Sequence, residues 1–187
     1  PQLQDNGIKP DLAAPGASVS AQVGTGTGER AFGGTSGATP MAAGAAALLL
    51  QGYRSGFDFD KGLRSSKIRL SPLEVKALVM NTSEVNIRNT DEGPLAPVTR
   101  IGGGEVRVDR ALASPAAAWD EDGLTGALGF GFVDVAGGSV NITKRVRLRN
   151  YSSSPVTYRL ATTFRFADDE ANGAVILSVP PVVSVGA

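Results

Sequence analysis

The segment from Thr39 to Tyr53 constrains the fold most, because it reads T-P-M-A-A-G-A-A-A-L-L-L-Q-G-Y and has no charge before Arg54. Ala and Leu are strong helix formers, and Pro40 is tolerated in a first helical turn. The segment therefore predicts a helix over residues 39–53, ended by Gly52 or Gly56. A helix without a polar face is expected to be buried all round.

The composition excludes several kinds of site. The 187 residues include no histidine and no cysteine, so the chain has no disulfide, no thiol nucleophile and no histidine base or ligand. Its 18 basic and 18 acidic residues give a net charge of 0, which provides no general attraction to nucleic acid or to an anionic membrane. The longest small apolar run, Met41 to Leu50, is about half the length that a membrane span needs.

Shorter patterns flank the uncharged helix. Residues 17–23 read A-S-V-S-A-Q-V, an alternation that favours a half-buried strand, and the polar residues 56–69 favour a loop. The sequence Ser71-Pro72-Leu73-Glu74 is typical of a helix start, with Ser71 as the N-cap and Glu74 at the third position. It predicts a helix over residues 72–81.

From about Gly123 onward the sequence alternates like a series of strands. The predicted strands are 127–135, 139–149, 155–166, 174–179 and 182–185. Antiparallel strands at this spacing suggest a β-sandwich, which usually needs about seven strands and roughly 100 residues. Residues 123–187 are too few for a whole sandwich, so we expect a truncated one.

Ser36 follows the loop Gly33-Gly34-Thr35, where the chain passes into the predicted helix. The start of a helix supplies unpaired N–H groups and partial positive charge, which stabilise the oxyanion formed when a serine attacks a carbonyl. The alternative is that Ser36 is only a helix N-cap. That is the commoner role at such a junction, and spacing alone favours it.

Four blocks of the sequence, in the same order, resemble the subtilisin-like serine peptidases. They are K-P-D-L-A-A-P-G at 9–16, G-T-S-G-A-T-P-M-A-A-G at 34–44, S-P-L-E-V-K-A-L-V-M-N-T at 71–82 and G-G-E-V-R-V-D-R-A-L at 103–112. The resemblance implies that Ser36 is the nucleophile and that its N–H donates to the oxyanion. Gly33, Gly34 and Thr35 would shape the substrate cleft. Two positions depart from the family: Gly37 replaces the usual Met, and Met41 replaces the usual His.

The resemblance also implies the fold and the setting. Residues 1–115 would be the C-terminal portion of an α/β, parallel-sheet catalytic domain, and residues 123–187 an incomplete fibronectin-type-III-like module. Because the subtilisin triad runs Asp, His, Ser along the chain, its Asp and His, with the oxyanion Asn, are expected before Pro1. We therefore expect part of a secreted or cell-envelope serine endopeptidase that cleaves protein or peptide substrates. Its partner would be the upstream half of the domain, and the chain alone would be inactive.

Three other interpretations stay open. The first is that the chain belongs to a non-catalytic binding module, either a pseudopeptidase or an adhesive β-sandwich. A Ser–Lys site would use Lys9 as the base. The third is calcium binding by an acidic group, although no metal or other cofactor is predicted. The acidic groups Asp120-Glu121-Asp122 and Asp168-Asp169-Glu170 lack the D-x-D-x-D-G pattern of a calcium loop, and solvated loops explain them.

Overall fold

The computed structural model describes residues 8–56 and 67–187, so most of the predicted loop 56–69 lies outside the described residues. Its contacts divide the chain into two compact units, residues 1–148 and 149–187, which are described separately below. The predicted domain boundaries at residues 115 and 123 stay predictions.

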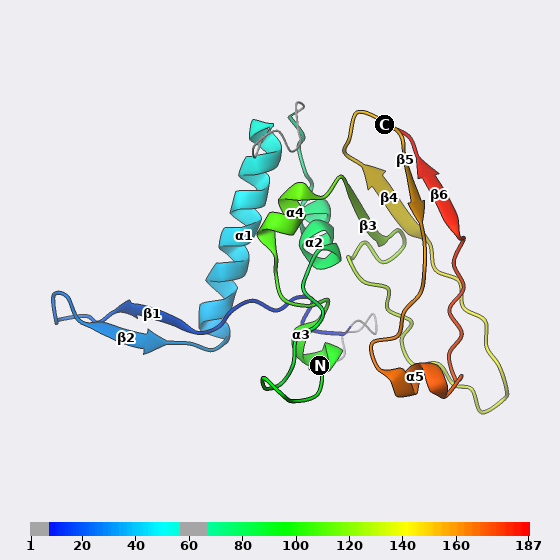
Figure 1. The fold of residues 1–187 in the computed structure, drawn as a ribbon, viewed down its shortest axis with the longest axis horizontal. Helices are drawn as coiled ribbons and strands as arrows, with labels where there is room; N and C mark the ends of the chain where they lie inside the picture. The colour runs from blue at the N-terminus through cyan, green and yellow to red at the C-terminus, as the bar shows by residue number, and fades with distance from the viewer. Residues whose placement is uncertain (1–7, 57–66) are drawn as a thin grey trace. The chain divides into compact units, whose positions relative to one another are not determined.

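Among the residues that the structure describes, the first unit begins with two short strands, continues with four helices and ends with strands (Figure 1). Its elements in chain order are β1 (Ser18–Ala21), β2 (Glu29–Phe32), α1 (Thr35–Ser55), α2 (Pro72–Asn81), α3 (Val98–Ile101), α4 (Val108–Ala113) and β3 (Ala116–Asp120), and β4 (Val146–Asn150) begins at its end. The second unit holds β5 (Val156–Arg159), α5 (Ala167–Ala171) and β6 (Val182–Val185).

Helix α1 confirms the predicted helix but is longer, because it starts at Thr35 and includes Pro40. Gly56 ends it in the left-handed conformation with φ 68°. The expectation that it is buried all round is wrong in this structure. Met41 is 51% and Leu48 53% exposed, so apolar side chains on one side of the helix are open to solvent.

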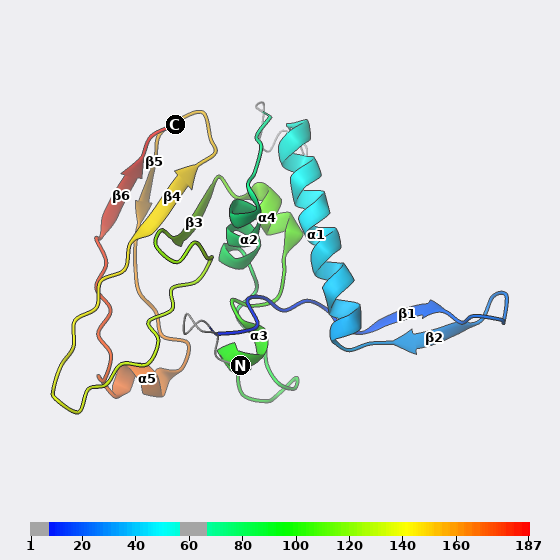
Figure 2. The same cartoon turned by 180° about the vertical axis from the view of Figure 1, so that it is seen from behind.

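A neighbouring face of α1 packs against α2 and α4, and both views of the ribbon show the three helices side by side (Figures 1 and 2). Apolar side chains with no exposed surface form this core: Leu49, Tyr53, Ala77, Leu78 and Ala111. The Tyr53 hydroxyl donates to the Ser114 carbonyl over 3.1 Å, so the phenol group is paired as well as buried. A buried aromatic side chain with a satisfied hydroxyl is a strong anchor for a small core.

Helix α2 confirms the helix predicted from its start sequence. The Ser71 hydroxyl accepts from the Glu74 N–H over 3.3 Å, and the Glu74 carboxylate accepts from the Ser71 N–H over 2.8 Å. This reciprocal pair satisfies two N–H groups at the helix start. At the other end, Asn81 Oδ1 accepts from the Ala118 N–H over 2.8 Å, which fastens α2 to β3.

The strands form three two-stranded sheets: β1–β2, β3–β4 and β5–β6. The first and third are antiparallel, with Ser18 opposite Phe32 and Val156 opposite Val185 at one end of each register. The strands expected near 17–23 and 182–185 are therefore confirmed, but the expected half-burial of the first is wrong, since all four residues of β1 are exposed. No parallel sheet and no β-sandwich forms among the residues that the structure describes.

Several local predictions need correction. Residues 127–135 and 174–179 alternate like strands but form none. Within 139–149 only residues 146–149 are strand, and within 155–166 only residues 156–159 are. An alternating sequence gives a segment one apolar face, but it does not supply a neighbouring strand. A strand needs such a neighbour to pair its backbone N–H and C=O groups. The acidic group at 168–170, expected in a loop, lies in the short helix α5, although its side chains are exposed to solvent.

The turn after β3 is organised by Asp120, whose side chain is 2% exposed. Its Oδ1 accepts from the N–H groups of Asp122 (3.0 Å) and Gly123 (2.9 Å), and its Oδ2 lies 3.3 Å from Lys144 Nζ. Beside it, Arg145 pairs with Asp122 and Arg147 pairs with Glu121. These contacts hold residues 144–147 against the end of β3.

The Gly123 N–H, then the Asp122 N–H and Lys144, lower the pKa of Asp120 below its ordinary value of 3.8, against the opposing effect of burial. The ionised carboxylate therefore stabilises the fold fully at pH values above the ordinary pKa of the group. The stabilisation is lost as the pH falls through the lowered pKa.

We expect Asp120→Ala to lower the free energy of unfolding by about 1–3 kcal/mol, because two N–H groups and Lys144 lose their acceptor. Asp120→Asn keeps Oδ1 and is the matched control, with a smaller loss. Urea unfolding at about pH 7 and about pH 3 checks both, and the wild-type advantage should shrink at the lower pH. An Ala variant as stable as the wild type near neutral pH would contradict this role of Asp120.

Candidate active site

Ser36 is the second residue of α1, and its side chain is exposed. The N-cap is Gly34, and no side chain caps the helix, so the interpretation of Ser36 as an N-cap is wrong. In an α-helix the N–H groups of the first turn have no acceptor within the helix. The Ser36 N–H is one of these, so the hydroxyl and an N–H donor belong to the same exposed residue.

Gly34 produces the sharp turn before Ser36. Its φ of 83° and ψ of −166° lie in a region that is essentially restricted to glycine. Strand β2 ends at Phe32, so the chain reverses from strand to helix within Gly33 and Gly34. Thr35 begins the helix, and its carbonyl accepts from the Thr39 hydroxyl over 2.8 Å. The three neighbours predicted to shape the cleft therefore do form one turn with Ser36.

The structure brings together the sequence blocks at 9–16 and 103–112. The Gly103 N–H donates to the Asp11 carbonyl over 2.9 Å, and the Val106 N–H donates to the Ala13 carbonyl over 2.9 Å. Ala13 and Glu105 form an isolated parallel bridge, which is a single pairing and not a sheet. Two blocks that are far apart in the sequence thus lie against each other beneath the site.

Lys9, the alternative base, is engaged elsewhere. Its Nζ pairs with the Asp11 carboxylate, and Lys76 Nζ lies 3.1 Å from the same Asp11 oxygen. Burial alone would raise the pKa of Asp11, but hydrogen bonds from Lys9 and Lys76 outweigh it and lower that pKa. The structure therefore pairs Lys9 with Asp11, and it gives no support to a Ser–Lys site.

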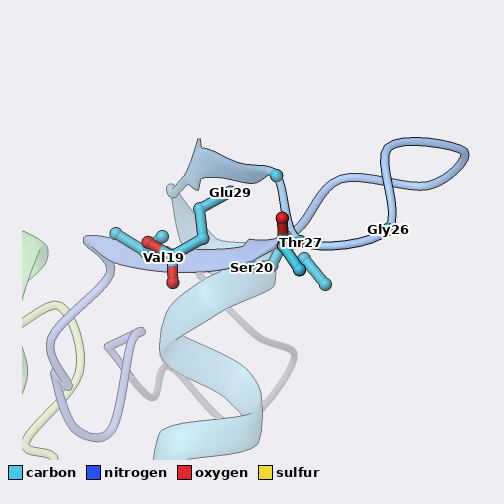
Figure 3. A pocket seen from close by; sticks show the side chains of 7 residues that line it. Val19, Ser20, Gly26, Thr27 and Glu29 are labelled. Carbon is cyan, nitrogen blue, oxygen red and sulfur yellow. The ribbon is translucent and has the colours of Figure 1, made fainter.

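Hollows elsewhere on the surface do not include Ser36. One, of about 250 Å³, lies on the β1–β2 hairpin, where Val19, Ser20, Thr27 and Glu29 line it (Figure 3). A two-stranded hairpin with exposed side chains offers no buried polar group to orient a substrate. A second hollow, of about 320 Å³, lies between α1 and α4 and is lined mainly by apolar groups.

Sequence reasoning missed Gly16, which lies directly against the turn that holds Ser36. A Cβ at Gly16 would be 2.9 Å from the Gly34 carbonyl oxygen. The A-P-G ending of the first block is a signal for a turn, but it does not say what the turn touches.

Within residues 8–56 and 67–187, no three His, Cys, Asp or Glu side chains are arranged to hold a metal ion. Among the same residues, no helix has the length and apolar character needed to cross a membrane.

Comparison with known proteins agrees with the arrangement of these blocks. A model described as the subtilase family matches residues 1–131. The chain belongs to the subtilase family. Over 178 residues it is 26% identical to the minor extracellular protease Vpr of Bacillus subtilis strain 168. That match covers 92% of this chain but 20% of Vpr, so the chain spans about a fifth of the relative's length.

Family membership relates the chain to serine peptidases and confirms the coarse part of the sequence interpretation. It covers the site turn and all the helices of the first unit. The fibronectin-type-III-like assignment of residues 123–187 is not established by these matches. The role of Ser36 and its neighbours stays a prediction, which the geometry of the turn now makes specific.

The backbone of Gly34 leads to a stability prediction. A Gly34→Ala protein should lose about 1–3 kcal/mol of unfolding free energy, although the space around a Cβ there is empty, because the backbone conformation excludes L side chains. Gly44→Ala, on α1 with nothing within 4 Å of its Cβ, is the control and should gain about 0.5–1 kcal/mol. Urea unfolding measures both, and equal effects of the two changes would refute the strain at Gly34.

Proposed function

We propose that this chain is the serine-bearing, C-terminal part of a secreted subtilisin-like serine endopeptidase, with Ser36 as the nucleophile. The observation that carries the proposal is an exposed serine at the second position of a long helix, after a glycine turn, in a chain of the subtilase family. Gly33, Gly34 and Thr35 form the wall of the cleft beside it.

The proposed reaction follows from this geometry. Ser36 Oγ attacks the carbonyl carbon of a peptide bond, and its proton passes to a base that then gives it to the leaving amine. The peptide C–N bond breaks and an ester to Oγ remains, which water hydrolyses to release the acid and restore the serine. The Ser36 N–H and the positive end of α1 stabilise the oxyanion in both steps.

The base must come from elsewhere, because the chain contains no histidine. We infer that a preceding part of a longer polypeptide supplies the Asp, the His and the oxyanion Asn. The exposed apolar side chains of α1, Met41 and Leu48, support this, since such residues on a long helix with no charge before Arg54 are suited to burial by the rest of a catalytic domain. The parallel sheet expected from the family would belong to that part.

The extracellular or cell-envelope location is also part of the proposal, and it rests on a relative named as an extracellular protease. Residues 123–187 are proposed as an incomplete fibronectin-type-III-like module that follows the catalytic domain. The antiparallel pair β5–β6 is compatible with such a module.

A non-catalytic binding protein is the competing function, and the absence of histidine is the observation that favours it. The coding sequence upstream of Pro1 discriminates the two. An Asp block followed by a His block supports the peptidase, and their absence supports a pseudopeptidase.

The first functional prediction concerns Ser36 in the full-length protein. A serine-directed phosphonate should label Ser36, and Ser36→Ala should abolish labelling and lower peptide hydrolysis by about 10⁶-fold. Ser55→Ala, at the far end of α1, is the matched control and should leave both unchanged. Labelling that persists in Ser36→Ala would rule out Ser36 as the nucleophile.

The second functional prediction concerns the 187-residue chain by itself. It should show no peptide hydrolysis, because it contains no histidine to act as the general base for Ser36. A fluorogenic peptide assay, with the full-length protein as the positive control, measures this. Hydrolysis by the isolated chain that disappears in Ser36→Ala would show that the missing triad partners are not needed.

A further inference from the structure

The residue after Ser36 is Gly37, which is buried although the residues on either side of it are more accessible. A Cβ built on Gly37 would lie 2.6 Å from the carbonyl oxygen of Gly16, where ordinary contact begins near 3.4 Å. The neighbour is backbone, so no flexible side chain can move aside. Position 37 therefore accepts only glycine while Gly16 stays in place.

The Gly16 carbonyl oxygen also lies close to Gly33, which precedes Ser36. A Cβ on Gly33 would lie 3.1 Å from the Gly16 oxygen, and a Cβ on Gly16 would lie 2.9 Å from the Gly34 oxygen. The Gly16 peptide thus sits between the residues that precede and follow Ser36. The Gly34 carbonyl in turn accepts from the N–H groups of Gly37 (3.0 Å) and Ala38 (3.2 Å), which closes the first turn of α1 around this contact.

This contact links Ser36 to the rest of the first unit. Gly16 follows Ala13, which is hydrogen-bonded to the segment at 104–106. The position of the Ser36 turn is therefore set, through Gly16, by the hydrogen bonds between Ala13 and the segment at 104–106.

We propose that Gly37 is a positioning residue for Ser36. Lacking a side chain, it lets the Gly16 peptide pack directly into the first turn of α1, and this backbone contact holds the serine hydroxyl and N–H in their reactive orientation. The inference rests on the proposed peptidase function and adds a determinant of rate that touches neither the substrate nor the hydroxyl. A displacement of about 1 Å at a reacting group can cost about 100-fold in rate.

The test is a graded series of alanine variants in the full-length protein. The built Cβ distances are 2.6 Å for Gly37, 2.9 Å for Gly16 and 3.1 Å for Gly33, so the damage should decrease in that order. Gly37→Ala should lower kcat by about 10- to 100-fold and leave KM within about threefold. The rate of phosphonate labelling should fall in parallel, while Gly137→Ala, with nothing within 4 Å of its Cβ and outside the helices, leaves kcat, KM and labelling unchanged.

Activity is referred to the folded fraction, which the thermal unfolding transition of each variant provides. A fall in kcat per folded molecule in the predicted order supports the inference. Unchanged kcat per folded molecule in Gly16→Ala and Gly37→Ala overturns it, including when both variants are merely less stable, and the peptidase assignment then survives. If the wild-type protein is neither labelled nor active, the peptidase assignment fails and this inference fails with it.

Discussion

The packing of Tyr53 is the interaction on which the first unit depends most. Its ring is fully buried near the end of α1, and its hydroxyl is bonded to the Ser114 carbonyl, between α4 and β3. Leu49, one turn earlier, and Leu78 of α2 complete the same apolar cluster. Because α1 is a single rigid element, fixing its last turns here also fixes the direction in which its first residues, including Ser36, point.

A second layer of constraint comes from backbone contacts near the other end of α1. The segments at 9–16 and 103–106 are joined by main-chain hydrogen bonds, and Gly16 then lies against the Ser36 turn. Side-chain packing secures one end of the helix, and glycine-to-glycine contact secures the other. Such a division fixes the position of Ser36, since an exposed residue cannot be held by burial of its own side chain.

The elements that could be predicted from the sequence are those with a local physical signature. The capping sequence at Ser71 and Glu74 predicted α2, and the uncharged Ala- and Leu-rich run predicted α1. Helices α3 and α4 have Pro97 and Arg107 as N-caps, without a side-chain cap, so they carry no such signature. The strand patterns at 127–135 and 174–179 were misleading, because strand formation depends on a partner that alternation does not specify.

The candidate site was predictable to the same degree. The motif around Ser36 pointed to the residue and its neighbours as candidates, but only the backbone conformation at Gly34 could exclude Ser36 as the helix N-cap. The contact of Gly16 with Gly37 joins positions 21 residues apart. It could not be predicted from either glycine, because glycines are also common in ordinary turns.

The β1–β2 hairpin extends outward from the start of α1, and both ribbon views show it clear of the helices (Figures 1 and 2). Its two ends meet where Gly16 lies against Gly33. Residues 17–32 therefore form a hairpin loop whose two ends are held close together. Loops closed in this way tolerate changes of length at little thermodynamic cost. The hairpin is therefore an insertion point beside Ser36, where new sequence can be accommodated while the turn before α1 keeps its own support.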